Sequence, residues 1–353
     1  MKVPFNAPQT LYQKELEAVF RKRFGMEEVF FTTSCSSALD MAAQIIEAGP
    51  GDEIILPSFT YVTTAMGFAR RGARLVFTDI DPRTGVLDLK AVQGNLTKRT
   101  KAVIPVHYAG VSMDLDSLRA LQKEGDFYVI EDAAQAIGAR YKGRYLGTIG
   151  DMGTFSFHYT KNISTGEGGA LLMNNSGLKP RARVVFEKGT DRHDFIAGIK
   201  SEYSWVDFGG SYEMSEILKG RLLKEMEQLE AVIRKREALY RRYEKHFRST
   251  GLRSLEIPGY AQSNFHIFAL VFDARTQRDR MLKVLNQHGI QGTFHYQPLH
   301  KSPFGLKAGY DRFYLPETEA FAGGILRLPL YPGLSEDTVD TIAEIILKEW
   351  RNI

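Results

Sequence analysis

The stretch FSFHYTKNISTGEGGA, Phe155–Ala170, decides how the rest of the chain is interpreted. An apolar run leads to Lys161, and the glycine-rich segment TGEGG follows from Thr165. A lysine placed between a strand and a turn can act as a nucleophile. The simpler interpretation is a surface residue or a plain phosphate contact. A Walker-type phosphate loop is excluded, because the order of glycines, lysine and Ser/Thr that it requires is absent.

Short β-rich runs alternate with helical patterns on the N-terminal side of this stretch. The expected strands begin at Val29, Glu53, Arg74, Ala102 and Phe127, and the expected helices cover residues 37–47, 63–70, 87–95 and 115–123. This alternation predicts an α/β domain with a mainly parallel sheet covered on both faces. Two further strands, residues 153–158 and 169–174, flank Lys161 without a helix of normal length between them, so we expect a different connection there.

The C-terminal part of the chain predicts a smaller α+β domain. Residues 214–247 form a nearly unbroken helical pattern that could leave the large domain. After it we expect a strand at 266–272, a helix at 278–288, a strand at 291–296 and a closing helix at 338–350. We therefore predict a large domain of residues 1–239 and a small domain of residues 240–353.

Composition and charge describe an ordinary globular protein. Of 353 residues, 43% are hydrophobic and 25% are charged, and 46 basic against 42 acidic residues leave a net charge of +4. The basic residues are dispersed or share a helix with glutamates, which indicates a solvated face rather than a nucleic-acid interface. The single cysteine, Cys35, excludes an internal disulfide, and no run approaches the ~18 apolar residues of a membrane span. The N-terminus lacks the apolar core of a signal peptide, so we predict a cytoplasmic protein without membrane contact.

Polar and aromatic residues follow several of the expected strands. In an open parallel sheet, ligands bind beyond the carboxyl ends of the strands. The segment TSCSSA from Thr33 opens a helix whose free N–H groups favour phosphate, although Ser and Thr are also common helix caps. Tyr61, His107 and Asp132 end other strands. Each has a plainer interpretation: a core aromatic, a packed histidine and a helix cap.

Taken together, these strand ends supply a phosphate site, an aromatic plate, an acid and a lysine. That is the set that pyridoxal phosphate requires. The lysine amine condenses with the aldehyde of the cofactor, and the acid keeps the pyridine nitrogen protonated. The aromatic side chain stacks on the ring. The combination is much more specific than any of its members, and it indicates no metal ion.

With these residues in place, the chain resembles the DegT/StrS family of sugar-nucleotide aminotransferases, which are fold-type-I pyridoxal-phosphate enzymes. The resemblance extends from PFNAP at Pro4 to LRLPLY at Leu326–Tyr331. Its most specific segments are PSFTYVTT from Pro57, EDAAQ from Glu131 and SFHYTK from Ser156. The implied fold is a large α/β/α domain with a mainly parallel sheet and a smaller C-terminal α+β domain.

The resemblance implies a role for each residue near the ring of the cofactor. Lys161 would bond covalently to the aldehyde and then shuttle protons. Asp132 would pair with the pyridine nitrogen, and Gln135 would hydrogen-bond the ring hydroxyl. Tyr61 would stack on the ring face, and His158 would help to position the ring or the substrate.

The resemblance also implies contacts to the phosphate and the substrate. Ser34, the backbone N–H of Cys35 and Ser156 would hold the phosphate of the cofactor. Relatives add an Asn from the neighbouring subunit before a Tyr-x-Met-Ser segment; here GGSYEMS places Ser211 there, which implies a homodimer with active sites at the interface. His295 and Arg327 are predicted to contact the donor carboxylate or the nucleotide, with structural hydrogen bonds as the alternative.

Within the family, the segments VHYAGV from Val106, EKGTDR from Glu187 and FHYQPLH from Phe294 narrow the implied reaction. L-Glutamate would donate its amino group to C4 of dTDP-4-keto-6-deoxyglucose, giving dTDP-4-amino-4,6-dideoxygalactose for surface polysaccharides. A 3-aminotransferase, another nucleotide and a non-catalytic regulator stay open as alternatives. Sugar dehydratases on this fold carry His in place of Lys161. Relatives also have a longer loop between PFNAP and the first helix than Gln9 and Thr10 provide.

Overall fold

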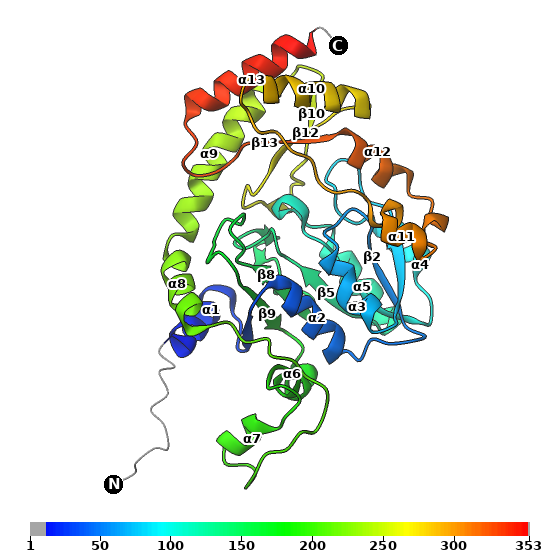
Figure 1. The fold of residues 1–353 in the computed structure, drawn as a ribbon, viewed down its shortest axis with the longest axis vertical. Coiled ribbons are helices and arrows are strands. Elements are labelled where there is room, and N and C mark those ends of the chain that lie inside the picture. The colour runs from blue at the N-terminus through cyan, green and yellow to red at the C-terminus, as the bar shows by residue number, and fades with distance from the viewer. Residues whose placement is uncertain (1–11, 352–353) are drawn as a thin grey trace.

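A seven-stranded sheet forms the centre of the computed structural model, which describes residues 12–351 (Figure 1). Gln9 and Thr10, where relatives have a longer loop, lie outside this range. The strand order across the sheet is β1 (Val29–Thr32), β9 (Gly169–Met173), β8 (Met152–Ser156), β5 (Tyr128–Asp132), β4 (Thr100–Val103), β2 (Glu53–Pro57) and β3 (Arg74–Thr78). The pairs from β8 to β3 are parallel, whereas β9 is antiparallel to both of its neighbours. The predicted mainly parallel sheet is confirmed, and the expected different connection is the turn from β8 back into β9.

Helices cover both faces of this sheet, and the strands are accordingly apolar throughout. Every residue of β2, β8 and β9 is buried. Along β2, Ile54 packs into the core under α2 (Cys35–Ile45) and α3 (Thr63–Arg70). Its neighbour Ile55 packs into the opposite core, which includes residues of α1 (Gln13–Phe24), α4 (Leu89–Asn95), α5 (Leu115–Gly125) and α8 (Glu216–Glu227). Alternate side chains of one strand therefore fill two cores.

A second, antiparallel sheet lies at the end of the molecule that carries the C-terminus (Figure 1). Its strands are β10 (Arg253–Ser254), β12 (Phe268–Val271) and β13 (Ile325–Leu328). They share a core with α9 (Leu229–Phe247), α10 (Arg275–Gln287) and α13 (Glu336–Trp350). The predicted domain boundary at residue 240 falls inside α9, and it stays a prediction. No helix in residues 12–351 has the length and apolar character that crossing a membrane requires.

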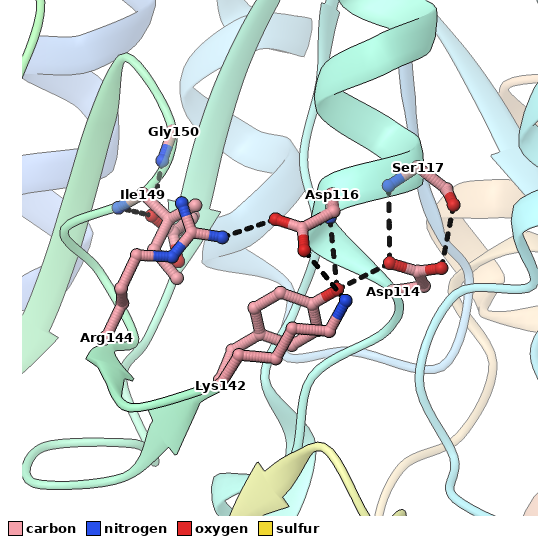
Figure 2. A network of polar contacts seen from close by, with 9 residues as sticks. Asp114, Asp116, Ser117, Lys142, Arg144, Ile149 and Gly150 are labelled. Atoms are coloured by element: carbon pink, nitrogen blue, oxygen red, sulfur yellow. Dashed lines mark hydrogen bonds and ion pairs between the residues drawn. The ribbon is translucent and has the colours of Figure 1, made fainter.

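A small third sheet is fastened to α5 by polar contacts. It consists of β11 (Ala261–Gln262), β6 (Arg140–Tyr141) and β7 (Arg144–Tyr145). Figure 2 shows Lys142 and Arg144 of this hairpin reaching Asp116, with 2.8 Å between Lys142 Nζ and Asp116 Oδ2. Asp114 caps α5 by accepting the N–H of Ser117 at 3.2 Å. These contacts tie the hairpin of β6 and β7 to the start of α5.

Short helices complete the described chain. They are α6 (Lys179–Phe186), α7 (Arg192–Ile196), α11 (Pro303–Lys307) and α12 (Pro316–Gly324), with 3₁₀ turns at Tyr108–Gly110, Ser176–Leu178, Leu299–Lys301 and Tyr310–Arg312. In Figure 1, α6 and α7 lie at the opposite end of the molecule from α13. The segment of α7 extends away from the main sheet.

Two predicted elements differ from the structure. The expected strand at 291–296 is wrong, because this segment meets the second sheet (β10, β12 and β13) only through an isolated bridge between Thr293 and Arg327. The expected continuous helix at 214–247 is two helices, α8 and α9, which meet at Gln228. There the N–H of Gln228 donates to the carbonyls of Glu225 and Met226, and the chain continues directly into α9. Hydrophobic periodicity persists through such a junction and cannot reveal it.

Candidate active site

A cavity of about 760 Å³ lies where β2, β5 and β8 end and α2 begins. All but two of the predicted site residues line it; the exceptions are Ser211 and Arg327. Segments that are far apart in sequence meet there because the parallel strands deliver their carboxyl ends to one edge of the sheet. The loop at His295 and Tyr296 closes the cavity on the side of the second sheet (β10, β12 and β13).

One wall of the cavity is the first turn of α2. Ser34 caps this helix by accepting the N–H of Ser37 at 3.0 Å, so the opening N–H groups point out of the helix end. These groups have no acceptor inside a helix, and together with the dipole they favour an anion. Gly169 of β9 passes so close that a Cβ there would overlap the backbone of Ser34 and Cys35. The glycines after Lys161 thus allow β9 to lie against the candidate phosphate site.

The carboxylate of Asp132 is held at the end of β5 by two donors. Thr64 Oγ1 donates to Oδ2 at 2.7 Å, and the N–H of Ala134 donates to Oδ1 at 3.1 Å. Thr60 and Thr64 hydroxyls bond each other at 2.8 Å. Asp132 is therefore buried, oriented and still able to accept another hydrogen bond. Thr64 had not been singled out from the sequence, although it lies in the segment PSFTYVTT that did point to the site.

Lys161 lies in the turn between β8 and β9, where its N–H donates to the carbonyl of His158 at 2.9 Å. Burial lowers the pKa of its amine, and the positive charge of Arg327 adds to this effect, whereas Cys35 and Asp132 oppose it. A lowered pKa increases the neutral fraction of the amine, which is the nucleophilic form. The site thus prepares this lysine for attack on a carbonyl group.

Gln135 is fixed so that its amide faces the same end of the cavity as Asp132. Its Oε1 accepts the N–H of Ala109 at 2.8 Å, and its Nε2 donates to the hydroxyl of Tyr296 at 3.0 Å. A second hydrogen on Nε2 is left for a ligand. The ring of Tyr296 lies 6.3 Å from that of the exposed Tyr61. Tyr296 was missed as a site residue, although it lies in the quoted segment FHYQPLH.

Arg327, on β13 of the second sheet, lies next to His295. Its Nη1 donates toward the ring of His295, where Nε2 is the nearer nitrogen and Nδ1 lies at 3.1 Å. Its Nε is buried without a partner, and within residues 12–351 it forms no ion pair. Burial lowers the pKa of His295 to about 3, with Arg327 and Lys161 contributing, so this ring is neutral near pH 7. An uncompensated cation beside a neutral imidazole suits an anionic group of a ligand.

The remaining predicted residues have different surroundings. Burial and the charge of Asp132 raise the pKa of the Cys35 thiol, so Cys35 can contribute its backbone but is a poor nucleophile. Ser156 lies at the end of β8 in the cavity wall, and His158 is exposed at its edge, 3.0 Å from the hydroxyl of Thr160. Ser211 is exposed outside the cavity, in a bridge with Glu187. Its assignment to a neighbouring subunit stays a prediction.

The donors and acceptors of this cavity fit pyridoxal phosphate. The start of α2 suits the phosphate, the Asp132 carboxylate suits a protonated ring nitrogen, and the Gln135 amide suits a ring hydroxyl. Lys161 supplies an amine with a lowered pKa. Gly169 leaves room for the backbone of Ser34 and Cys35, with which any side chain at position 169 would collide.

Comparisons with known proteins agree with this fit. The family described as DegT/DnrJ/EryC1/StrS aminotransferase matches residues 9–347. MJ1066 of Methanocaldococcus jannaschii, itself uncharacterized, is 31% identical over 350 residues, which cover 97% of this chain and 90% of that protein.

Solved structures of two proteins show the same fold over nearly the whole chain. Spr1654 of Streptococcus pneumoniae, provisionally described as a sugar aminotransferase, matches in its PMP form with a TM-score of 0.90 and 26% identity, covering 98% of this chain and 93% of that one. Its PLP form matches with a TM-score of 0.89. The aminotransferase TlmJ of Streptoalloteichus hindustanus matches with a TM-score of 0.88 and 31% identity, covering 98% and 92%.

Proposed function

We propose, from the premise that this chain belongs to the DegT/DnrJ/EryC1/StrS aminotransferase family, that it moves the amino group of L-glutamate onto the 4-keto carbon of a nucleotide-linked 4-keto-6-deoxyhexose. The chain is a pyridoxal-phosphate-dependent aminotransferase. The observation that carries the proposal is one cavity in which the buried Asp132 carboxylate and the Lys161 amine, with its lowered pKa, occur together. Among acceptors we favour dTDP-4-keto-6-deoxyglucose, with dTDP-4-amino-4,6-dideoxygalactose as the product. The description of Spr1654 supports a sugar acceptor.

Pyridoxal phosphate supplies an aldehyde that takes up the amino group and a ring that accepts electrons. The residues of the chain bind it, orient it and move protons. The N-terminus of α2 binds the phosphate, Asp132 holds the proton on the ring nitrogen and Gln135 donates to the ring hydroxyl. Tyr61 covers the ring face and limits the access of water. Lys161 Nζ would take the proton from the substrate carbon that bears the amino group and deliver it to the aldehyde carbon of the cofactor, and it would move the proton in the opposite direction when the sugar is aminated.

We propose that Arg327 binds a carboxylate of the amino donor. Replacing Arg327 with alanine is expected to raise the KM for L-glutamate by about 10- to 100-fold, the range for losing a hydrogen bond to a charged group. The cofactor should stay bound, because Arg327 is not part of the cavity wall around α2. Steady-state kinetics with varied L-glutamate measure the change. Arg253→Ala, which removes an exposed arginine paired with Asp273, is the control. An unchanged KM in Arg327→Ala would exclude this role.

We propose a homodimer in which Ser211 contacts the cofactor phosphate of the neighbouring subunit. The support is an exposed apolar group on the segment around α7, in which Ile199, Trp205 and Phe208 are each more than 70% exposed. Exposed patches of this kind mark interaction surfaces. Ser211 follows directly on this segment. Analytical ultracentrifugation is expected to give a dimer, and Trp205→Asp combined with Phe208→Asp should shift it toward monomer. A wild-type monomer would contradict the proposal.

The acceptor is tested with a panel of keto-sugars. L-Glutamate should first convert the bound cofactor to its amine form with release of 2-oxoglutarate, seen as loss of visible absorbance. The converted enzyme is then mixed with 4-keto and 3-keto sugars linked to dTDP, UDP or GDP, and the products are identified by NMR. We expect a 4-amino product from the dTDP-linked 4-keto-6-deoxy sugar. A 3-amino product would replace our acceptor by the 3-keto alternative, and failure of L-glutamate to convert the bound cofactor would exclude it as the amino donor.

A further inference from the structure

A buried pair of ionisable residues adjoins the cofactor cavity and has no part in the mechanism above. His107 and Glu131 are both fully buried, and His107 Nε2 lies 2.8 Å from Glu131 Oε2. Glu131 lies next to Asp132 on β5, and the N–H of His107 donates to the carbonyl of Asp132 at 3.0 Å. His107 itself lines the cavity.

The surroundings of Glu131 decide which nitrogen of His107 carries hydrogen. Oε1 accepts the N–H groups of Ile149 and Gly150, both at 2.6 Å. Figure 2 labels these two donors, and a dashed line leaves each of them. Oε2 accepts the N–H of Gly147 at 2.8 Å. Burial alone would raise the pKa of Glu131, but the hydrogen bond from His107 and the backbone donors outweigh it and lower this pKa. An ionised carboxylate can only accept, so His107 Nε2 must be the donor.

The other ring nitrogen is then left for a ligand. His107 Nδ1 is buried and has no hydrogen-bond partner within residues 12–351. A buried polar atom without a partner costs free energy, and native proteins rarely leave one unsatisfied. His107 belongs to the same cavity wall as Asp132 and Gln135. A hydrogen on Nδ1 would have no acceptor among residues 12–351, so the neutral ring with its hydrogen on Nε2 leaves Nδ1 as an unpartnered acceptor, in a residue of the wall that also carries Asp132 and Gln135.

We propose that His107 is a cofactor-binding residue whose Nδ1 accepts a hydrogen bond at the ring edge held by Asp132 and Gln135, directly or through one ordered water. Glu131 is the positioning residue: it fixes the tautomer and orientation of the imidazole, as carboxylates do for functional histidines. The competing explanation is purely structural, in which His107 serves only to satisfy Glu131 and to anchor the turn at 147–150.

Two substitutions separate these explanations, because each retains one end of the imidazole. In His107→Gln, the amide nitrogen can take the place of Nε2 and still donate to Glu131. In His107→Asn, the shorter amide oxygen can take the place of Nδ1 and still accept. We expect His107→Gln to bind pyridoxal phosphate about tenfold more weakly, the size of one lost hydrogen bond, with a Tm near that of the wild type. We expect His107→Asn to bind it nearly as well as the wild type but to unfold at a lower Tm.

The measurement is a titration of the cofactor-free protein with pyridoxal phosphate, followed by fluorescence, together with thermal unfolding of each variant. Wild-type affinity in His107→Gln would overturn the proposal, as would weaker binding in His107→Asn than in His107→Gln. If His107→Asn does not fold, the affinity of His107→Gln still decides. Neither the amino donor nor the sugar takes part in this experiment, so its failure would leave the proposed reaction intact.

Discussion

Replacing Lys161 with alanine is expected to remove the visible absorbance of the bound cofactor and to slow amino transfer by about 10⁴-fold or more, the upper range for losing a positioned proton-transfer group. Among residues 12–351, no second lysine lines the cavity that could take its place. The lowered pKa of Lys161 also depends on its burial, which a residue elsewhere could not reproduce. Absorbance spectra and single-turnover kinetics with L-glutamate measure both effects.

Lys142 provides a matched control for this substitution. Its amine pairs with Asp116 on the surface (Figure 2), and neither residue lines the cavity. Lys142→Ala should therefore keep the absorbance and the activity, with at most a small loss of stability, because exposed ion pairs contribute little. Retained visible absorbance in Lys161→Ala would remove the basis for placing the cofactor on this lysine.

Replacing Asp132 with asparagine should leave pyridoxal phosphate bound but slow turnover by about 10³-fold, since the ring accepts electrons well only while its nitrogen is protonated. An asparagine oxygen can still accept from Thr64 or Ala134, so the local structure should persist. What disappears is the negative charge. The cofactor content is measured by absorbance and the rate by 2-oxoglutarate release.

Thr64→Val tests whether orientation or charge of Asp132 matters more. It removes the hydroxyl that donates to Asp132 at 2.7 Å but keeps the carboxylate. We expect a loss of about tenfold, consistent with one hydrogen bond. If Asp132→Asn turns over at the wild-type rate, the electronic role of Asp132 is refuted. Equal losses in both variants would point to positioning rather than charge.

The sequence predicted the main sheet well because its signals are local. Buried runs such as that of β2 end in polar segments, and in a parallel sheet those ends must meet at one edge. The places of Asp132 and Lys161 in one cavity follow from this rule. The reversed direction of β9 was foreseen only as a different connection, because local patterns do not show with which strands, and in which direction, a segment pairs.

Features that depend on distant contacts could not be predicted from local patterns. His107 was predicted to be a packed histidine. Only the structure shows that its Nε2 bonds Glu131, which also accepts from the turn at 147–150, and that its Nδ1 has no hydrogen-bond partner within residues 12–351. The segment at 291–296 has the composition of a strand, but it makes one bridge to Arg327 instead of a ladder. Arg327 and His295 were predicted as substrate contacts only through the resemblance, because nothing in the spacing of the sequence joins them to Lys161.

The most direct measurement of the central claim locates the cofactor on the chain. Borohydride reduction of the enzyme with bound pyridoxal phosphate fixes the cofactor to the lysine that carries it, and peptide mass spectrometry then identifies that residue. We predict that the added mass is found on Lys161, in the peptide that contains FHYT, and that prior addition of L-glutamate prevents the labelling. A label on another lysine, or labelling that L-glutamate does not affect, would contradict the claim that this cavity is the active site of an aminotransferase.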